Sequence, residues 1–268
     1  MDKVAIAQLF EKIRNEHPLV HHITNPVTMN DCANTTLAIG GSPVMAMSVE
    51  EVGEMASLAN ALVINFGTID AVVYEAMVIA GKAANEKGIP VILDPVGVGA
   101  TQFRREKAAD FFEQVDVAIV RGNATEIHAC VGGNSSTRGV DVGKLENQSI
   151  ATLAYEAAKK LQAVIVISGE KDVICNGQQL VTVDNGDIWL TKITGTGCMT
   201  ASLIGCFAGV TEQYFEAAIA GMSVMSLAGE VAKQALNEED GIGTFRVQLL
   251  DQLFKMDGAF WKERVRYE

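Results

Sequence analysis

The stretches Leu62-Val63-Ile64-Asn65 and Val91-Ile92-Leu93-Asp94 decide the fold class. Each is a short, continuous apolar run, which is typical of a strand that is buried on both faces of a parallel sheet. Further short strands are expected at residues 19–23, 43–46, 117–120 and 164–167. The sequence therefore predicts a sheet that is covered on both sides.

Helical patterns follow these runs along the chain. The clearest is an apolar stripe with the spacing of one helix face, formed by Ile150, Leu153, Ala154, Ala157, Ala158 and Leu161. Shorter helices are expected over 31–39 and 50–59. Alternation of strands and helices indicates an α/β fold with a mostly parallel central sheet and helices on both faces.

The pattern changes after residue 171. Three short strands are expected at 172–176, 180–184 and 188–192, with hairpin signals at Asn176-Gly177 and Asn185-Gly186. They predict an antiparallel edge of the sheet. Helices are expected from about Cys198 to Lys233 and over 249–263. Because no linker or internal repeat interrupts the chain, we expect one domain over residues 1–268.

The composition limits the kinds of partner. The 268 residues include 21 Lys and Arg against 33 Asp and Glu, a net charge of −12. Such a surface repels nucleic acid and anionic membranes, and no basic patch offsets it, so we expect neither as a partner. The stretches 199–210 and 217–229 are too short to span a bilayer and predict buried helices. The N-terminus has no signal-peptide pattern, the five cysteines form no C-x-x-C, and the four histidines have no familiar zinc spacing. These features predict a cytoplasmic protein with reduced thiols.

The stretch Thr194-Gly195-Thr196-Gly197-Cys198-Met199-Thr200 is the strongest functional signal. A glycine-rich turn before an apolar helix can direct several backbone N–H groups at one point, which suits a phosphate. An ordinary glycine turn remains the alternative. The missing Gly-Lys-Ser/Thr excludes a Walker A loop, and the late position disfavours a Rossmann dinucleotide site.

Polar side chains follow several expected strands. Asp94 ends one run, Arg121 and Glu126 follow another, Ser168 ends a third and Asn25 follows the first. Because ligands of open parallel sheets bind beyond the carboxyl ends of the strands, Asp94, Arg121 and Glu126 are expected near the Gly195 turn. Ser168 could offer a hydroxyl to a nucleotide phosphate, with a simple turn as the alternative, and Asn25 could present an amide to a small substrate. Carboxylates beside a phosphate usually act through Mg²⁺. The alternatives are a turn residue for Asp94, a solvated carboxylate for Glu126 and a surface charge for Arg121.

Five motifs together carry a resemblance to a known family. They are Val20-His21-His22-Ile23-Thr24-Asn25, Gly41-Ser42-Pro43-Val44-Met45-Ala46, Leu93-Asp94-Pro95-Val96-Gly97, Arg121-Gly122-Asn123-Ala124-Thr125-Glu126 and Thr194-Gly195-Thr196-Gly197-Cys198. With Asn34, they resemble hydroxyethylthiazole kinases of the ribokinase-like superfamily over nearly the whole chain.

The resemblance implies a specific activity. Such enzymes transfer the γ-phosphate of ATP to the primary alcohol of 4-methyl-5-(2-hydroxyethyl)thiazole in thiamine salvage. It implies that Met45, through its backbone amide, and Gly195 contact the thiazole, with Asn25 nearby. It assigns Arg121 and Ser168 to ATP, and Asp94 and Glu126 to Mg²⁺. The family is typically a homotrimer with sites between subunits.

One position departs from the wider superfamily. Most members place an aspartate base where this chain has Cys198, so the base stays open. We expect the backbone amides of Gly195, Thr196, Gly197 and Cys198 to do most of the catalytic work, with weak help from the thiol. The alternative functions are a pyridoxal or hydroxymethylpyrimidine kinase and a nucleotide-binding module without turnover. A mobile flap is expected over 132–147.

Overall fold

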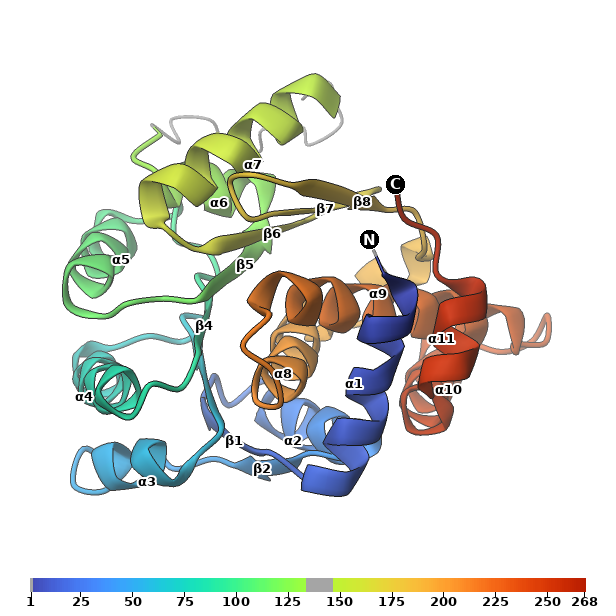
Figure 1. Ribbon diagram of the computed structural model, residues 1–268, viewed down its shortest axis with the longest axis horizontal. Coiled ribbons are helices and arrows are strands. Elements are labelled where there is room, and N and C mark those ends of the chain that lie inside the picture. The colour runs from blue at the N-terminus through green and yellow to red at the C-terminus, as the bar shows by residue number, and fades with distance from the viewer. Residues whose placement is uncertain (1, 134–146) are drawn as a thin grey trace.

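The computed structural model, which describes residues 2–133 and 147–268, contains an eight-stranded sheet in the described part of the chain (Figure 1). The strand order is β2-β1-β3-β4-β5-β6-β7-β8. The bounds are β1 Leu19–Ile23, β2 Ser42–Val44, β3 Ala61–Asn65, β4 Val91–Asp94, β5 Ile119–Asn123, β6 Val164–Ser168, β7 Asp172–Cys175 and β8 Leu180–Val183. Strands β1 to β6 are parallel, and β7 and β8 are antiparallel. The predicted fold class, antiparallel edge included, is confirmed.

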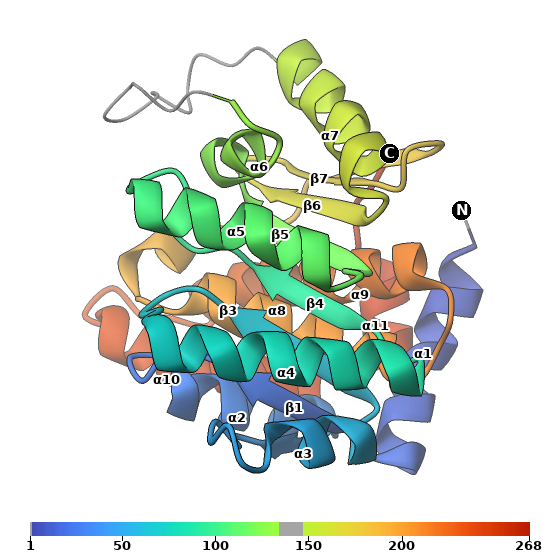
Figure 2. The same cartoon turned by 90° about the vertical axis from the view of Figure 1, so that its left-hand side faces the viewer.

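Helices cover both faces of the sheet, as Figures 1 and 2 show. One layer contains α3 (Val52–Leu58), α4 (Ala71–Lys87), α5 (Gln102–Gln114), α6 (Ala124–Cys130) and α7 (Asn147–Leu161). The other contains α1 (Lys3–Glu16), α2 (Met29–Ile39), α8 (Thr196–Ala208), α9 (Tyr214–Gln234), α10 (Ile242–Lys255) and α11 (Gly258–Arg264). Along β3, Leu62 and Ile64 pack on the first layer, while Ala61 and Val63 pack on the second. This alternation explains why the central strands are apolar without interruption.

The two long apolar stretches near residue 200 are internal helices. In α8, every residue from Met199 to Ala208 is buried. Among the described residues, α9 is the one helix long and apolar enough to cross a membrane, but 83% of its most apolar window is buried inside the fold. The helices α8 and α9 are therefore core elements of the second helical layer.

The antiparallel edge differs from the expectation at its third segment. The Asn176-Gly177 turn joins β7 and β8, as predicted, with Gly177 at a φ of +85°. The strand expected at 188–192 is wrong, because Ile188–Lys192 form a 3-10 helix, η2. The Asp187 side chain accepts a hydrogen bond from the Trp189 N–H, and the Trp189 ring packs on Phe245 of α10. This capping and packing favour a short helix over a strand.

The chain returns to this edge near its C-terminus. Thr182 of β8 exchanges two backbone hydrogen bonds with Glu268, at 2.9 and 3.0 Å, and the Asp184 N–H donates to the Arg266 carbonyl. Val183 and Tyr267 form an isolated antiparallel bridge. Part of the outer edge of β8 is therefore covered by residues 266–268.

Other boundaries are shifted by local capping. The single helix expected over 249–263 is two helices, because the Asp257 side chain accepts from the Phe260 N–H and starts α11. The expected strand at 117–120 begins two residues later and continues to Asn123. Of the flap expected over 132–147, residues 134–146 lie outside the described residues.

Candidate active site

A cavity of about 430 Å³ lies at the carboxyl ends of the parallel strands. In the sheet, β2 lies on one side of β1 and β3 on the other, so the strand order reverses at β1. Open parallel sheets bind their ligands beside such a reversal, at the carboxyl ends of the strands. The lining of the cavity includes these predicted site residues: Asn25, Asp94, Arg121, Glu126, Ser168, Gly195, Gly197 and Cys198. The expected convergence of strand ends with the glycine-rich turn is what the structure shows.

The glycine-rich turn is the start of α8, two residues earlier than expected. Gly195 is its N-cap, with a φ of +92°, and no side chain caps the helix there. Thr196, Gly197 and Cys198 form its first turn, and the N–H groups of a first turn have no acceptor inside the helix. This helix start favours an anion in the cavity.

Gly197 allows close contact between this helix start and Arg121. A Cβ on Gly197 would lie 2.3 Å from Arg121 Nη1, well inside the van der Waals distance. The guanidinium and the free N–H groups therefore border the same space.

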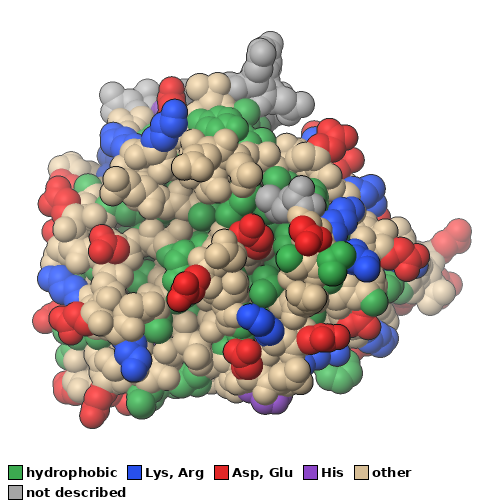
Figure 3. Space-filling model, viewed as in Figure 1, with side chains coloured by type: hydrophobic (Ala, Val, Ile, Leu, Met, Phe, Trp, Pro, Cys, Tyr) green, Lys and Arg blue, Asp and Glu red, His purple; other side chains and the backbone are tan. Residues whose placement is uncertain are grey.

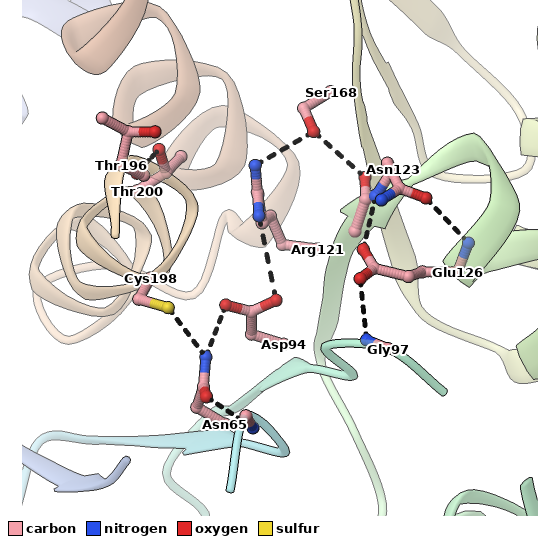
Figure 4. Close-up of polar contacts among 12 residues, drawn as sticks. Asn65, Asp94, Gly97, Arg121, Asn123, Glu126, Ser168, Thr196, Cys198 and Thr200 are labelled. Carbon is pink, nitrogen blue, oxygen red and sulfur yellow. Dashed lines mark hydrogen bonds and ion pairs between the residues drawn. The ribbon is translucent and has the colours of Figure 1, made fainter. Parts of the chain in front are cut away.

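Arg121 lies between a hydroxyl and a carboxylate (Figure 4). Its Nη2 donates to Ser168 Oγ at 3.0 Å, and its Nη1 is 3.8 Å from Asp94 Oδ1. Asp94 Oδ1 and Arg121 Nε are buried and have no hydrogen-bond partner within the described residues. The loose ion pair and the unpaired buried atoms are what a site for a charged ligand should show.

Asp94 is fully buried at the end of β4. Burial raises the pKa of its carboxyl to about 6, the Arg121 charge opposes the rise, and the Glu126 carboxylate adds to it. A cation in the cavity would favour the ionised form.

Glu126 has a structural role in addition to its place in the cavity wall. Its carboxylate accepts from the Gly97 N–H and the Asn123 N–H, both at 2.9 Å, while the Asn123 side chain accepts from the Glu126 N–H. This is a capping box at the start of α6. The residue is therefore more than the solvated carboxylate considered as an alternative.

Cys198 is held among amide groups. Its sulfur accepts from Asn65 Nδ2 at 3.3 Å and from Asn25 Nδ2 at 3.6 Å. Burial and the neighbouring Asp94 carboxylate raise the pKa of the thiol. Burial of the thiol therefore outweighs the lowering of its pKa that a helix N-terminus can produce.

A second cavity of about 740 Å³ adjoins the first and shares Arg121, Ser168 and Gly197 with it. Thr196 and Thr200 line it, and the Thr196 hydroxyl donates to the Leu190 carbonyl at 3.1 Å. Its far part is apolar, with Ile188, Leu190, Met222 and Met225. The two cavities meet at Arg121, so one elongated ligand can reach from the apolar end to the helix start.

Comparison with known proteins agrees with this geometry. Residues 10–258 match the family described as "Hydroxyethylthiazole kinase family". The chain belongs to this family. A hydroxyethylthiazole kinase of Ruminiclostridium cellulolyticum is 45% identical over 264 residues, which are 97% of this chain and 96% of the relative. One of Clostridium botulinum is 44% identical over 270 residues, covering 99% and 96%.

Solved structures extend the comparison. A hydroxyethylthiazole kinase of Pyrococcus horikoshii superimposes with a TM-score of 0.88 at 35% identity, covering 99% of this chain and 98% of that chain. A ribokinase-like superfamily protein of Enterococcus faecalis has a TM-score of 0.64 at 12% identity, covering 94% and 95%, and shares the fold.

One residue assigned through the family resemblance lies apart from the cavity. Met45 follows β2 at the end of the sheet and is absent from the lining of both cavities. Ala46, which follows Met45, contacts the buried His21, whose Nε2 lies 2.8 Å from the Ala46 carbonyl oxygen. His22 is buried against Ser202. Both histidines therefore pack within the fold.

The site of this hydroxyethylthiazole kinase family member also contains a residue that sequence analysis missed. Asn65 ends β3 and donates to Asp94 Oδ2 at 2.7 Å. Its signal was the same as that of Asp94, a polar residue at the end of a buried apolar run. Strand periodicity does not show which side chains meet across neighbouring strands, so the contact had no sequence signature.

Proposed function

We propose that this chain transfers the γ-phosphate of ATP to the primary alcohol of 4-methyl-5-(2-hydroxyethyl)thiazole, in thiamine salvage. The observation that carries the proposal is the meeting of Arg121, Asp94 and the α8 start in one cavity of a chain that belongs to the hydroxyethylthiazole kinase family. The alcohol oxygen bonds to the γ-phosphorus, the bond from that phosphorus to the β–γ bridging oxygen breaks, and ADP and a proton leave.

The two cavities suggest how ATP lies. The apolar part of the larger cavity suits the base, and Arg121 and Ser168 at the junction suit the phosphates. The free N–H groups of Thr196, Gly197 and Cys198 then face the transferring phosphoryl group. Because phosphoryl transfer depends on positioning and on stabilising charge, these donors can do most of the work.

The residues of the smaller cavity fit a magnesium ion. Asp94 Oδ1 is a buried carboxylate oxygen without a hydrogen-bond partner in the described part of the chain, and Glu126 lies in the same wall. Mg²⁺ is usually held by one or two carboxylates together with phosphates and water, so a larger protein cage is not needed. When bound, the ion neutralises charge on the phosphate oxygens.

The thiazole is proposed to lie beside Gly195 and Asn25 in the smaller cavity, with Met45 completing the site. Because Met45 is outside the cavity wall, we propose that its part of the site forms in a homotrimer, with sites between subunits. One sheet includes all the described strands, which supports a single domain over 1–268. A cytoplasmic location is part of the same proposal.

A coupled assay of ADP release tests the function against a panel of thiazole, pyrimidine and pyridoxal alcohols. We expect hydroxyethylthiazole to be phosphorylated with a much higher kcat/KM than the other alcohols. An equal or higher kcat/KM with hydroxymethylpyrimidine or pyridoxal would replace the substrate assignment, and nucleotide binding without turnover would indicate a binding module.

A further inference from the structure

Asn65 lies behind the active site rather than in its wall. The residue is 2% exposed and is absent from the lining of the 430 Å³ cavity, whereas Asp94 and Cys198 line it. Its side chain nevertheless contacts the end of β4 and the start of α8 (Figure 4). It also accepts a hydrogen bond from Asn25, which follows β1. A buried amide at such a junction can fix the relative positions of the groups that it bonds.

The orientation of this amide is determined by its neighbours. The Gly67 backbone N–H donates to Asn65 Oδ1 at 2.8 Å, and a backbone nitrogen can only donate. The Asn65 NH₂ group must therefore face Asp94 Oδ2 at 2.7 Å and Cys198 Sγ at 3.3 Å. Asn25 Nδ2 donates to the same Oδ1 at 2.8 Å, so both N–H bonds and both lone-pair positions of Asn65 are used.

The Asn25 amide is fixed in the same way. Its Oδ1 accepts from the Thr28 N–H at 3.2 Å, which turns its NH₂ group towards Asn65 and Cys198. The backbone at Gly67 closes over the pair, because a Cβ on Gly67 would lie 2.7 Å from Asn25 Nδ2 and 2.8 Å from Asn65 Oδ1. The amide pair is thus tightly enclosed.

These contacts decide which oxygen of Asp94 faces the cavity. Asn65 holds Oδ2, and Oδ1 is left on the side of Arg121 without a hydrogen-bond partner among the described residues. We propose that Asn65 is a positioning residue for phosphoryl transfer, which holds Asp94 Oδ1 towards the phosphates and the Cys198 thiol in place at the α8 start. This inference rests on the proposed kinase function.

Asn65→Asp is the most informative variant. It has nearly the same size and keeps an acceptor for Gly67 and Asn25, but it replaces the donor to Asp94 and Cys198 by an acceptor. We expect kcat to fall about 10- to 100-fold, the usual effect of removing a partner of a ligating group, while KM for the thiazole alcohol stays within about threefold. Asn65→Ala, which also releases Asn25, should in addition raise that KM.

A second background separates positioning from a general structural role. In an Asp94→Asn chain, the group that Asn65 positions has already lost its charge, so adding Asn65→Asp should lower kcat by no more than about twofold. The double variant also keeps a hydrogen bond between the two positions, because the amide introduced at position 94 can donate to the new carboxylate, which helps this variant to fold.

Calorimetric titration with ATP gives a readout besides turnover. In EDTA, the affinity of Asn65→Asp for ATP should stay within about twofold of the unmodified chain, because Arg121 and Ser168 are untouched. The gain in affinity on adding MgCl₂ should be about tenfold smaller. Asn85→Leu is the matched control. The Asn85 amide donates to the Asp116 carbonyl and accepts from the Asp116 N–H, far from the site. Its replacement should therefore change the stability of the fold alone.

The outcomes separate the two proposals. Two results would show that the positioning role is wrong in a chain that phosphorylates the thiazole alcohol. One is that Asn65→Asp keeps kcat within twofold of the unmodified chain. The other is that Asn65→Asp lowers kcat by the same factor in the Asp94→Asn chain as in the unmodified chain. If the unmodified chain phosphorylates no alcohol in the panel, the proposed function fails, and the magnesium-dependent gain in ATP affinity still decides the role of Asn65.

Discussion

At the scale of single residues, the environment of Cys198 argues against an essential thiolate. Two asparagine amides donate to its sulfur, and burial raises the pKa of the thiol. A sulfur that already accepts two hydrogen bonds, and that keeps its proton at neutral pH, is a poor acceptor for the proton of an alcohol. The loose transition state of phosphoryl transfer needs no early deprotonation.

We therefore predict that Cys198→Ser keeps kcat within about tenfold, and that Cys198→Asp, which supplies a carboxylate base, is active or improved. Steady-state kinetics at saturating ATP measure both. A loss beyond about a thousandfold in the serine variant, with an unchanged circular dichroism spectrum, would show that Cys198 is an essential base.

The two carboxylates of the site should respond differently to removal of charge. Asp94→Asn can still accept from Asn65, so we expect a stable fold with turnover at least about tenfold lower at every Mg²⁺ concentration. Glu126→Gln loses one of the two backbone bonds at the capping box, at a cost of about 1 kcal/mol, and should need more Mg²⁺.

The measurement is turnover against Mg²⁺ concentration, with thermal unfolding alongside. For a chain of this length the glutamine variant should lose about 2–4 °C in Tm. Glu86→Gln, on the exposed end of α4, is the control and should change neither quantity. Unchanged turnover in both site variants would leave Asp94 and Glu126 with structural roles only.

At the scale of elements, β7 begins with a buried carboxylate that ties it to α9. Asp172 accepts from the Ser226 hydroxyl at 2.7 Å and from the Gly169 N–H at 3.1 Å. Burial raises the pKa of Asp172 to about 6, against a usual value of 3.8. The folded chain therefore binds this proton more tightly than the unfolded chain, and the free energy of unfolding falls as the pH rises from about 4 to about 6.

Asp172→Asn should remove this dependence while it keeps both contacts, because an amide nitrogen can donate to the Ser226 hydroxyl. Urea unfolding at pH 4.5 and pH 7.5 measures the effect. We expect the stability of the variant relative to the unmodified chain to be greater at pH 7.5 than at pH 4.5 by about 2 kcal/mol, because about a third of the effect is already present at pH 4.5. Asp251→Asn, at an exposed position of α10, should show no such difference, and an equal result for the two would contradict the assignment.

How far the sequence predicts an element depends on what holds that element in place. The bounds of β4 agree with the expectation, because burial on both faces requires the apolar run that was recognised. The bounds of β1 agree as well, although His21 and His22 interrupt its apolar residues. Ile188–Lys192 have a similar composition but are held by the Asp187 cap and by Trp189 against Phe245, contacts that no local pattern shows. Asn65 was missed for the same reason, since its role comes from partners on β4 and α8.

At the scale of the whole molecule, the apolar surface that could support an oligomer lies outside the two long apolar stretches. The charge-free stretches 199–210 and 217–229 offer no apolar surface to a partner, because both belong to buried helices. Large apolar side chains are exposed elsewhere, among them Leu37 on α2 and Val247 and Phe254 on α10, which packs on α2. The face viewed in Figure 3 also mixes acidic and basic groups without a basic patch.

We predict a trimer as the active form. Burial of exposed apolar side chains would favour association, and a site between subunits would bring Met45 towards a cavity. Sedimentation equilibrium at assay concentrations measures the mass, and activity per chain should fall on dilution below the association range. A monomer with full activity would exclude the trimer.

The pairing of residues 266–268 with β8 has a consequence for biosynthesis. A ribosome adds Arg266 some 83 residues after Val183, which takes about 4–17 s at about 5–20 residues per second. During that interval the backbone groups of β8 that later pair with residues 266–268 are open to other nascent chains. Until residues 266–268 pair with it, this edge of β8 can mispair with a neighbouring nascent chain on the same polysome.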